Sequence, residues 1–454
     1  MFYQRLVLCL GLMLLTACGG QGSYSGPPSA TYVVSVTVSG LPSNGLSQVI
    51  IQNNGTEPLS FTKDGTQAFP QYQPMGTGYN VTISNQPSPS NCVVASGSGT
   101  NSTSSYVNIN VTCSEEFVYV ANNAVNTLAS LSIGAGGVLT PVGSAPATGV
   151  GPTSVVVHPN GNFAYVSNAG GNTISVYRIQ SGTLGSAIYV VPTDTGPVKL
   201  AITPNGNFLY AVNINAGTIS EYSIAQGGGL TAVAGSPYGA NNGVHQGGLN
   251  GLAIDPSSTY LYVSNATNST VYEYQIRASD GVLQYLGSTS AGLTAPTSVA
   301  ISPNGKFVYV VNSGANIVSI FSIGAGGTLT TSSSALTGTG PQNIAFTPNG
   351  AYAYVTNYNA GTGATISQFT VNTGAGIGAG DLTPMPLPSI YVRADQTSTG
   401  PYDVVVDPTG QTVFSSNRTS SSISQYSISN TGALSISNPE YSTGISSPQG
   451  IAVH

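Results

Sequence analysis

The chain has 454 residues and a formal net charge of −6, and only 5% of its residues are charged, against about a quarter in an average globular protein. Its eight Lys and Arg residues are spread over the whole length and form no basic patch, which argues against a nucleic-acid-binding protein. A hydrophobic content of 40% allows a large core, so we expect a folded chain and not a disordered one.

Residues 1–17 have the pattern of an export signal. One positive charge, Arg5, precedes an apolar run from Leu6 to Leu15 that is too short to span a membrane as a helix. The run ends in Leu-Thr-Ala-Cys18, which resembles the lipobox of bacterial lipoproteins. The resemblance implies cleavage before Cys18, a lipid on its sulfur and, given Gly19, sorting to the outer membrane if the cell has one. The alternative is a plain secretory signal with an incidental cysteine.

Residues 18–30 are rich in Gly, Ser and Pro and are predicted to be a flexible tether. The mature protein is therefore expected to be anchored in the cell envelope by its lipid, exposed to the periplasm or to the surface.

Residues 31–114 are predicted to form a small β-sandwich. Turn residues separate three alternating runs, Tyr32–Val38, Tyr79–Ser84 and Tyr106–Thr112, and one short apolar run, Gln48–Gln52. The pattern resembles the immunoglobulin-like modules of bacterial surface proteins. We expect this domain to act as a spacer between the membrane and the rest of the chain, with ligand binding as the alternative.

Two cysteines remain once Cys9 leaves with the signal and Cys18 carries lipid. Cys92 and Cys113 are expected to form a disulfide in an oxidising compartment, and the alternative is a pair of buried thiols.

A repeat with a period in the forties occupies residues 115–454. Its clearest copy, at 151–179, predicts strands at 155–157, 163–168 and 173–179, and a weaker strand near 182–184. Asn160-Gly161 indicates a hairpin turn, because both residue types tolerate positive φ. The second strand recurs as an aromatic residue three places before Asn, at Tyr119/Asn122, Tyr165/Asn168, Tyr210/Asn213, Tyr262/Asn265, Tyr309/Asn312, Tyr354/Asn357 and Phe414/Asn417.

These asparagines lie 46, 45, 52, 47, 45 and 60 residues apart. Such a period, made only of strands and turns, predicts an all-β fold with a seven-bladed β-propeller. The first copy, from Phe117, lacks its leading strand, and residues 447–454 supply one with nothing after it. We therefore expect the C-terminal strand to complete the first blade, which removes exposed sheet edges.

The repeat PNG-x-F-x-YV-x-N followed by TIS-x-Y resembles the YVTN-type propellers and the seven-bladed lactonase family, which includes 6-phosphogluconolactonase-like and carboxymuconate-lactonising proteins. The resemblance covers about residues 115–454. It implies the fold, because these motifs describe turns and core strands. A catalytic activity like that of the family is suggested by the similarity of fold alone, because the motifs name no catalytic residues.

The candidate site is the mouth of the central funnel, where loops enter the innermost strands. Hydrolysis of a lactone needs a base for water and a donor for the oxyanion. The best assembly would use His245 as the base, Lys199 or Arg418 on the negative charge of the substrate and Asp403 as the orienting group. The position before each inner apolar run is occupied by Ser154, Lys199, Gly251, Ser298, Asn343, Asp403 and Gly450.

Further ligand-binding candidates at the same mouth are Asn250, Asn343, Arg418 and Tyr358. Lys199 and Asp403 come from blades on opposite sides of the funnel, and Arg418 and Asp403, which share a blade, form an alternative pair. Asp255, Asp407, His158 and His454 fall at turns or chain ends and are expected to be structural. We expect no metal and no cofactor, because few carboxylates converge at the mouth.

Two functions remain open at this stage. The first is a non-catalytic binding or scaffold module, monomeric, with a protein, glycan or cell-wall partner at the propeller face. The second is a sugar-lactone hydrolase, the one enzymatic interpretation that the sequence offers. The small number of ionisable groups at the funnel favours the first.

Overall fold

The computed structural model describes residues 30–41, 48–85, 87, 90–134, 137–358, 364–392, 400–438 and 440–454. The predicted signal, Cys18 and the tether up to residue 29 lie outside these residues. The fold is all-β. In the part of the chain that the structure describes, no helix is long and apolar enough to cross a membrane.

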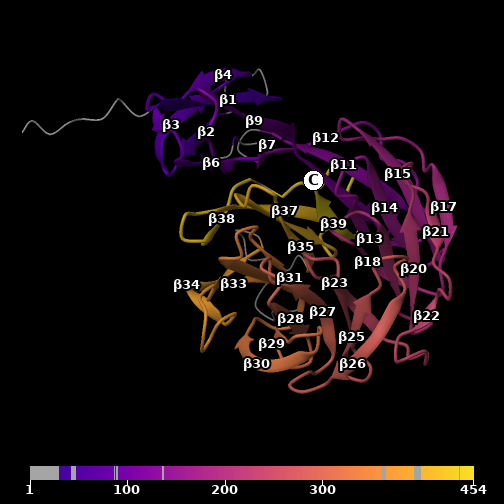
Figure 1. Cartoon of the computed structure of the whole chain (residues 1–454). Coiled ribbons are helices and arrows are strands. Elements are labelled where there is room, and N and C mark those ends of the chain that lie inside the picture. Colours follow the sequence, from indigo (N-terminus) through magenta and orange to yellow (C-terminus); the bar gives the residue numbers. More distant parts are fainter. Residues whose placement is uncertain are drawn as a thin grey trace, which may run out of the picture.

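The N-terminal strands form two sheets around one core (Figure 1). Val34 and Val36 of one sheet pack with Ile51 and Val81 of the other, so this part of the chain is a β-sandwich. Its immunoglobulin-like relationship stays a prediction. One sheet has the order β4 (Gly65–Ala68), β1 (Thr31–Ser39), β9 (Tyr106–Glu115), β7 (Ser90–Ala95), with β5 (Gln73–Pro74) on β1, and the other has the order β3 (Thr56–Phe61), β2 (Val49–Asn53), β6 (Gly78–Asn85), β8 (Ser98–Thr100).

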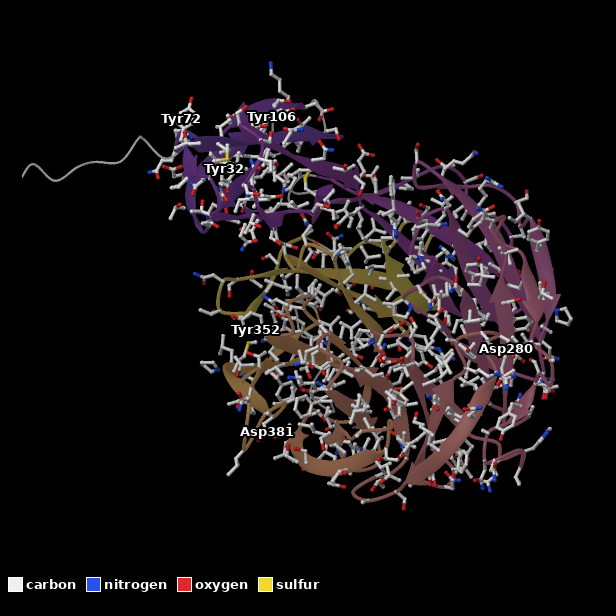
Figure 2. The ribbon with its side chains drawn as sticks, viewed as in Figure 1. Tyr32, Tyr72, Tyr106, Asp280, Tyr352 and Asp381 are labelled. Atoms are coloured by element: carbon white, nitrogen blue, oxygen red, sulfur yellow. A yellow bond between two sulfur atoms is a disulfide. The ribbon has the colours of Figure 1, made fainter. Side chains whose placement is uncertain are left out.

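The predicted disulfide is confirmed. Cys92 on β7 lies directly opposite Cys113 on β9, and the two are bonded. Tyr32 is buried in the sandwich, whereas Tyr72 and Tyr106 lie on its surface (Figure 2). The four runs predicted from the sequence correspond to β1, β2, β6 and β9, and the remaining strands, of two to six residues, were not predicted.

The rest of the described chain forms seven sheets around a common axis, which confirms the seven-bladed β-propeller (Figure 1). We number the blades from 1 to 7 and list each from its innermost strand outward. They are β39 (Pro448–Val453), β10 (Phe117–Asn122), β11 (Thr127–Ile133), β12 (Leu139–Pro141); β13 (Pro152–Val157), β14 (Phe163–Asn168), β15 (Thr173–Gln180), β16 (Thr183–Leu184) with β17 (Tyr189–Pro192); β18 (Pro197–Ile202), β19 (Phe208–Asn213), β20 (Thr218–Ile224), β21 (Leu230–Ala232) with β22 (Tyr238–Gly239); β23 (Leu249–Ile254), β24 (Tyr260–Asn265), β25 (Thr270–Ile276), β26 (Leu283–Thr289); β27 (Pro296–Ile301), β28 (Phe307–Asn312), β29 (Ile317–Ile323), β30 (Leu329–Leu336); β31 (Pro341–Phe346), β32 (Tyr352–Asn357), β33 (Thr365–Val371), β34 (Leu382–Tyr391); and β35 (Pro401–Val406), β36 (Thr412–Asn417), β37 (Ser422–Ile428), β38 (Leu434–Ile436).

The two ends of the repeat meet in blade 1. β39 pairs antiparallel with β10, with Val453 opposite Val118 and Ile451 opposite Val120. Figure 1 shows the yellow β39 beside the purple strands that begin the propeller. Each inner strand also contacts the inner strands of both neighbouring blades, so the ring is closed.

The turn between the first two strands of a blade depends on glycine more than on asparagine. Gly161 has a φ of 74°, and its N–H donates to the carbonyl of His158 at 2.8 Å. Asn160 keeps a negative φ, and its side-chain oxygen accepts the N–H of Asn162 at 3.0 Å. The predicted hairpin turn is confirmed; the glycine alone uses positive φ, and the asparagine acts as a side-chain acceptor.

The aromatic residues of the repeat join each blade to the next. In blade 3, Tyr210 Oη donates to the carbonyl of Gly281 in blade 4 at 2.6 Å. Phe208 packs on the same glycine so closely that a Cβ there would lie 2.4 Å from its ring. Among the described residues, four further blade junctions repeat both contacts, through Tyr165 with Phe163, Tyr262 with Tyr260, Tyr309 with Phe307 and Tyr354 with Tyr352, the last of which is labelled in Figure 2.

The third strand of a blade adds a polar contact at the same junctions. Glu273 Oε2 accepts the N–H of Leu329 at 3.3 Å, and Gln368 Oε1 accepts that of Leu434 at 2.6 Å. Glu221 occupies the equivalent position in blade 3 and accepts the N–H of Leu283. Burial raises the pKa of Glu221 to about 7 and also raises the pKa of Glu273.

The repeating asparagines are all buried at the end of the second strand. Asn168 donates to Thr173 Oγ1 at 3.1 Å and to Ser175 Oγ at 3.0 Å, both on the next strand. Asn213 and Asn417 make the same pair of contacts in their own blades. These side chains therefore fix the loop between the two strands, which is a structural role.

Candidate functional site

A bulge lies at the start of each inner strand and turns the neighbouring side chains toward the funnel. In blade 2 the pairing between β13 and β14 slips between Pro152 and Ser154, and the other blades show a similar irregularity. The proline has no N–H for the ladder, and a bulge re-aims the side chains beside it. In several blades a hydroxyl of the second strand accepts the N–H of the bulged residue, as in Ser167 with Ser154 and Ser416 with Asp403.

The residues at these bulges line a cavity of about 160 Å³ at the funnel mouth. It is large enough for one six-membered ring, since a cavity of about 150 Å³ accepts benzene. Its polar side chains come from six of the blades described above, blades 2 to 7, and are Thr153, Lys199, Asn250, Thr297, Ser298, Gln342, Asn343, Tyr402 and Asp403.

Four of these residues form a row of hydrogen bonds and one ion pair across the funnel, which we call the polar belt: Lys199, Ser298, Asn343 and Asp403. Lys199 Nζ lies 3.6 Å from Asp403 Oδ2. Asn343 Nδ2 donates to Asp403 Oδ1, and Ser298 Oγ donates to Asn343 Oδ1 at 2.6 Å. The sequence places Lys199 and Asp403 in blades on opposite sides of the ring, and the structure brings their side chains together because the lysine spans the narrow funnel.

Asp403 is buried, with an exposed fraction of 6%, and both of its carboxylate oxygens are occupied. Oδ1 accepts the N–H of Val404 at 3.0 Å as well as Asn343, and Oδ2 accepts the N–H of Ile451 at 3.3 Å beside the lysine. A carboxylate offers about four acceptor positions. Three of them hold N–H donors, and the Lys199 ammonium lies 3.6 Å from Oδ2 as an ion-pair partner, so the carboxylate is poorly placed to take a proton from water.

The Lys199 ammonium has N–H groups that can donate to a ligand. The side chain has an exposed fraction of 31%, and the ammonium carries three N–H groups. Among the described residues Asp403 is its one ionic partner, so the remaining N–H groups can serve a ligand in the cavity.

The polar belt also separates the mouth from an apolar channel. A second cavity of about 430 Å³ shares Lys199, Asn343 and Asp403 with the first. Below them it is lined by aliphatic residues of the inner strands, at 155–157, 404–406 and 451–453, and it reaches Pro159 at the turn end of blade 2. The chemistry that could recognise a polar ligand is therefore confined to the mouth.

The other predicted site residues lie outside the cavity lining, except Asn250. His245 is exposed in the loop between β22 and β23, so the structure does not bring it to Lys199 and Asp403. The Arg418 guanidinium lies 5.8 Å from the centre of the Tyr402 ring. Tyr358 Oη lies 3.4 Å from Thr419 Oγ1. Arg418 therefore reaches the site only through Tyr402.

Sequence reasoning missed Thr153, Thr297, Gln342 and Tyr402, which stand directly after the proline of the inner-strand frame. The signal was present, since they precede the predicted positions by one residue, and the bulge brings both residues to the cavity. Burial raises the pKa of Tyr402, and the Asp403 charge adds to this while Arg418 opposes it.

The titratable groups at the turn end are engaged in local structure. Asp255 Oδ1 accepts the N–H groups of Thr259 and Tyr260, each at 2.6 Å, and Asp407 Oδ1 accepts two turn N–H groups in the same way. His158 Nε2 lies 3.0 Å from the carbonyl of Gly206. Within the described ranges, no group of three or more His, Cys, Asp or Glu side chains is arranged to hold a metal ion.

The fold and its cavity define a seven-bladed β-propeller with a polar site at one mouth of the ring. A family model described as lactonase, 7-bladed beta-propeller, matches residues 88–188, 150–244, 184–337 and 326–453. The chain therefore belongs to the lactonase seven-bladed β-propeller family. A search of curated proteins finds no significant match.

Solved structures show the same fold. A protein of Bacteroides uniformis that has been assigned as a 6-phosphogluconolactonase is 20% identical, with a TM-score of 0.63 over 75% of this chain and 99% of that one. The periplasmic gluconolactonase of Pseudomonas aeruginosa is 17% identical, with a TM-score of 0.61 over 75% of this chain and 99% of that one. At this level of identity the similarity establishes the fold alone.

Proposed function

We propose that the propeller is a non-catalytic binding module that takes a small neutral polyhydroxylated ring, of the sugar type, at the funnel mouth. One observation carries the proposal: in the polar belt, Lys199 keeps donors for a ligand, while Asp403 is buried, accepts three N–H groups and faces the ammonium. A hydrolase that works without a metal needs a general base with a free lone pair for water. A binding site needs only donors and acceptors of fixed direction.

The lining supports a sugar-type ligand. Asn250 and Gln342 offer amide donors and acceptors, Thr297 offers a hydroxyl, and Tyr402 offers an aromatic ring. Hydroxyl groups on a saturated ring can use all of these, and the volume of about 160 Å³ limits the ligand to one ring or the end of a longer glycan.

Calorimetric titration with gluconolactam, a neutral ring that water does not open, tests the proposal. We expect the mature chain to bind it and Lys199→Met to bind it roughly 10-fold to 100-fold more weakly, the loss typical of a hydrogen bond to a charged group. The matched control is Lys306→Met, because Lys306 is exposed in the turn at the other end of its blade. Binding that is absent in the wild type, or unchanged in Lys199→Met, would contradict the proposal.

Lactone hydrolysis is the alternative, and family membership favours it. In that case a Lys199 N–H would polarise the lactone carbonyl, and the base would have to be a group outside the polar belt or an Asp403 carboxylate released from its present partners. Gluconolactone opening followed by acid release decides between the two. The proposal expects the same rate with and without the protein. A saturable acceleration that Lys199→Met abolishes would establish a hydrolase instead.

The setting we propose is the cell envelope, with a lipid on Cys18 holding a monomer whose sandwich acts as a spacer. The support is the lipobox-like Leu-Thr-Ala-Cys18 and the disulfide between Cys92 and Cys113, which needs an oxidising compartment. A cell-wall or surface glycan is the partner that this location and the polar cavity favour. Mass spectrometry of the membrane fraction should find diacylglycerol on Cys18. The Cys18→Ser variant should instead be recovered in the soluble fraction. An unmodified Cys18 would contradict the anchor.

A further inference from the structure

The funnel mouth contains one positive and one negative side chain that face the same small space. Of the described residues that line the cavity, Lys199 is the only cation and Asp403 the only anion. Arg418 lies outside the lining, over the ring of Tyr402. The charge of the cavity wall is therefore zero as long as both groups are ionised.

The position of the anion decides what the cation can recognise. Asp403 Oδ2 lies 3.6 Å from Lys199 Nζ, so an anion that approaches the ammonium also approaches the carboxylate. Because both interactions vary inversely with distance, repulsion by the carboxylate offsets part of the attraction that an anion feels toward the ammonium. The carboxylate does not repel a neutral hydroxyl or carbonyl oxygen in this way, and such an oxygen can still accept a lysine N–H.

Three other strands supply the groups that hold the Asp403 carboxylate beside Lys199. Asn343 of β31 donates to Oδ1, Ile451 of β39 donates to Oδ2, and the ammonium of β18 completes the set. The carboxylate therefore cannot swing away to leave the lysine free, as a flexible surface partner could.

We propose that Asp403 is a specificity-determining residue: it cancels the charge of Lys199 and makes the funnel mouth select neutral rings over phosphorylated or carboxylated ones. This inference deepens the proposed function, because both place the ligand at the polar belt. It predicts that the anion-binding capacity of Lys199 is latent and appears when the carboxylate is neutralised.

Asp403→Asn tests this with little change of shape. The amide oxygen can keep the N–H of Val404 and the Asn343 contact, while the amide nitrogen faces Ile451, whose bond of 3.3 Å is the longest of the set. Asp403→Ser removes the charge by a different route and avoids the opposed donors. Circular dichroism establishes which of the two is folded.

The measurement is the binding of inorganic phosphate near neutral pH and at low salt, where electrostatic contacts are least screened. We expect the folded Asp403 variants to bind phosphate at least about tenfold more tightly than the wild type, because one unopposed cation then faces the cavity. The double variant Lys199→Met/Asp403→Asn should return to the wild-type level. Equal phosphate binding by the wild type and the Asp403 variants would overturn the inference, and so would tight binding that survives in the double variant.

The two proposals fail separately. If the wild type does not bind gluconolactam but the Asp403 variants gain phosphate binding, the neutral-sugar function is wrong and the role of Asp403 stands. If gluconolactam binds and neutralising Asp403 leaves phosphate affinity unchanged, the function stands and the role of Asp403 is wrong.

Discussion

Glu221→Gln is expected to stabilise the propeller at neutral and alkaline pH. Glu221 lies in the middle of β20 with an exposed fraction of 2%, and its Oε1 atom has no hydrogen-bond partner. Burial raises its pKa from 4.5 to about 7. Blades 6 and 7 already carry Gln368 and Gln425 at the equivalent position, so the ring accommodates a glutamine there.

The direction and the size of this stability change follow from the protonation of Glu221 in the folded and in the unfolded chain. Below pH 4.5 Glu221 is protonated in both states. Between 4.5 and about 7 the unfolded chain loses the proton and the folded chain keeps it, so the free energy of unfolding falls as the pH rises. This window of about 2.5 pH units, at about 1.36 kcal/mol each, gives a loss of about 3 kcal/mol that is complete above the folded pKa.

Urea unfolding followed by tyrosine fluorescence measures this, since the chain has no Trp and 26 Tyr. Near pH 5 the variant and the wild type should differ little, and near pH 8 the variant should be more stable by about 3 kcal/mol. Glu115→Gln, at an exposed position, is the control and should follow the wild type. If Glu221→Gln loses as much stability as the wild type between these pH values, the assignment of a buried, ionising Glu221 is refuted.

Three further predictions concern contacts that hold the fold together: a hydrogen bond between blades, the ring closure and the disulfide. Tyr210→Phe leaves the Gly281 carbonyl without its donor and should lower the free energy of unfolding by about 1–3 kcal/mol; the exposed Tyr189→Phe is the control, and equal stability of both variants would contradict the role of the hydroxyl. Removal of residues 447–454 takes away the inner strand of blade 1 and should replace a cooperative urea transition by a broad one, whereas an unchanged transition would mean that ring closure does not hold the blades together. Cys113→Ser should lower the stability of the sandwich by about 3 kcal/mol and leave the propeller transition unchanged, which fluorescence and proteolysis can separate.

The fold was predictable from the sequence because its signals are local and repeated. The turn glycines and the Tyr and Asn spacing recur from blade to blade, and together with the split first blade they determine the ring and its closure. The partner of each tyrosine was not predictable in this way. Tyr210 and Gly281 lie 71 residues apart, and periodicity does not say which carbonyl of the next blade the hydroxyl reaches.

The site was predictable in position but not in its contacts. The frame around the inner-strand proline identified Lys199, Asn343 and Asp403, and the structure places all three at one cavity. Their hydrogen bonds depend on the width of the funnel, which chain order does not encode, so the reach of Lys199 to Asp403 could not be deduced. His245 illustrates the opposite case, because the length of a loop does not fix where its tip lies.

A crystal structure of the mature chain with gluconolactam would test the central claim most directly. We predict the ring in the funnel mouth, with one of its oxygens at hydrogen-bond distance from Lys199 Nζ and with Asp403 still bonded to Lys199, Asn343 and the N–H groups of Val404 and Ile451. A ring bound elsewhere, or a water held by a released Asp403 carboxylate against the ring carbonyl, would contradict a neutral-ligand site without catalysis.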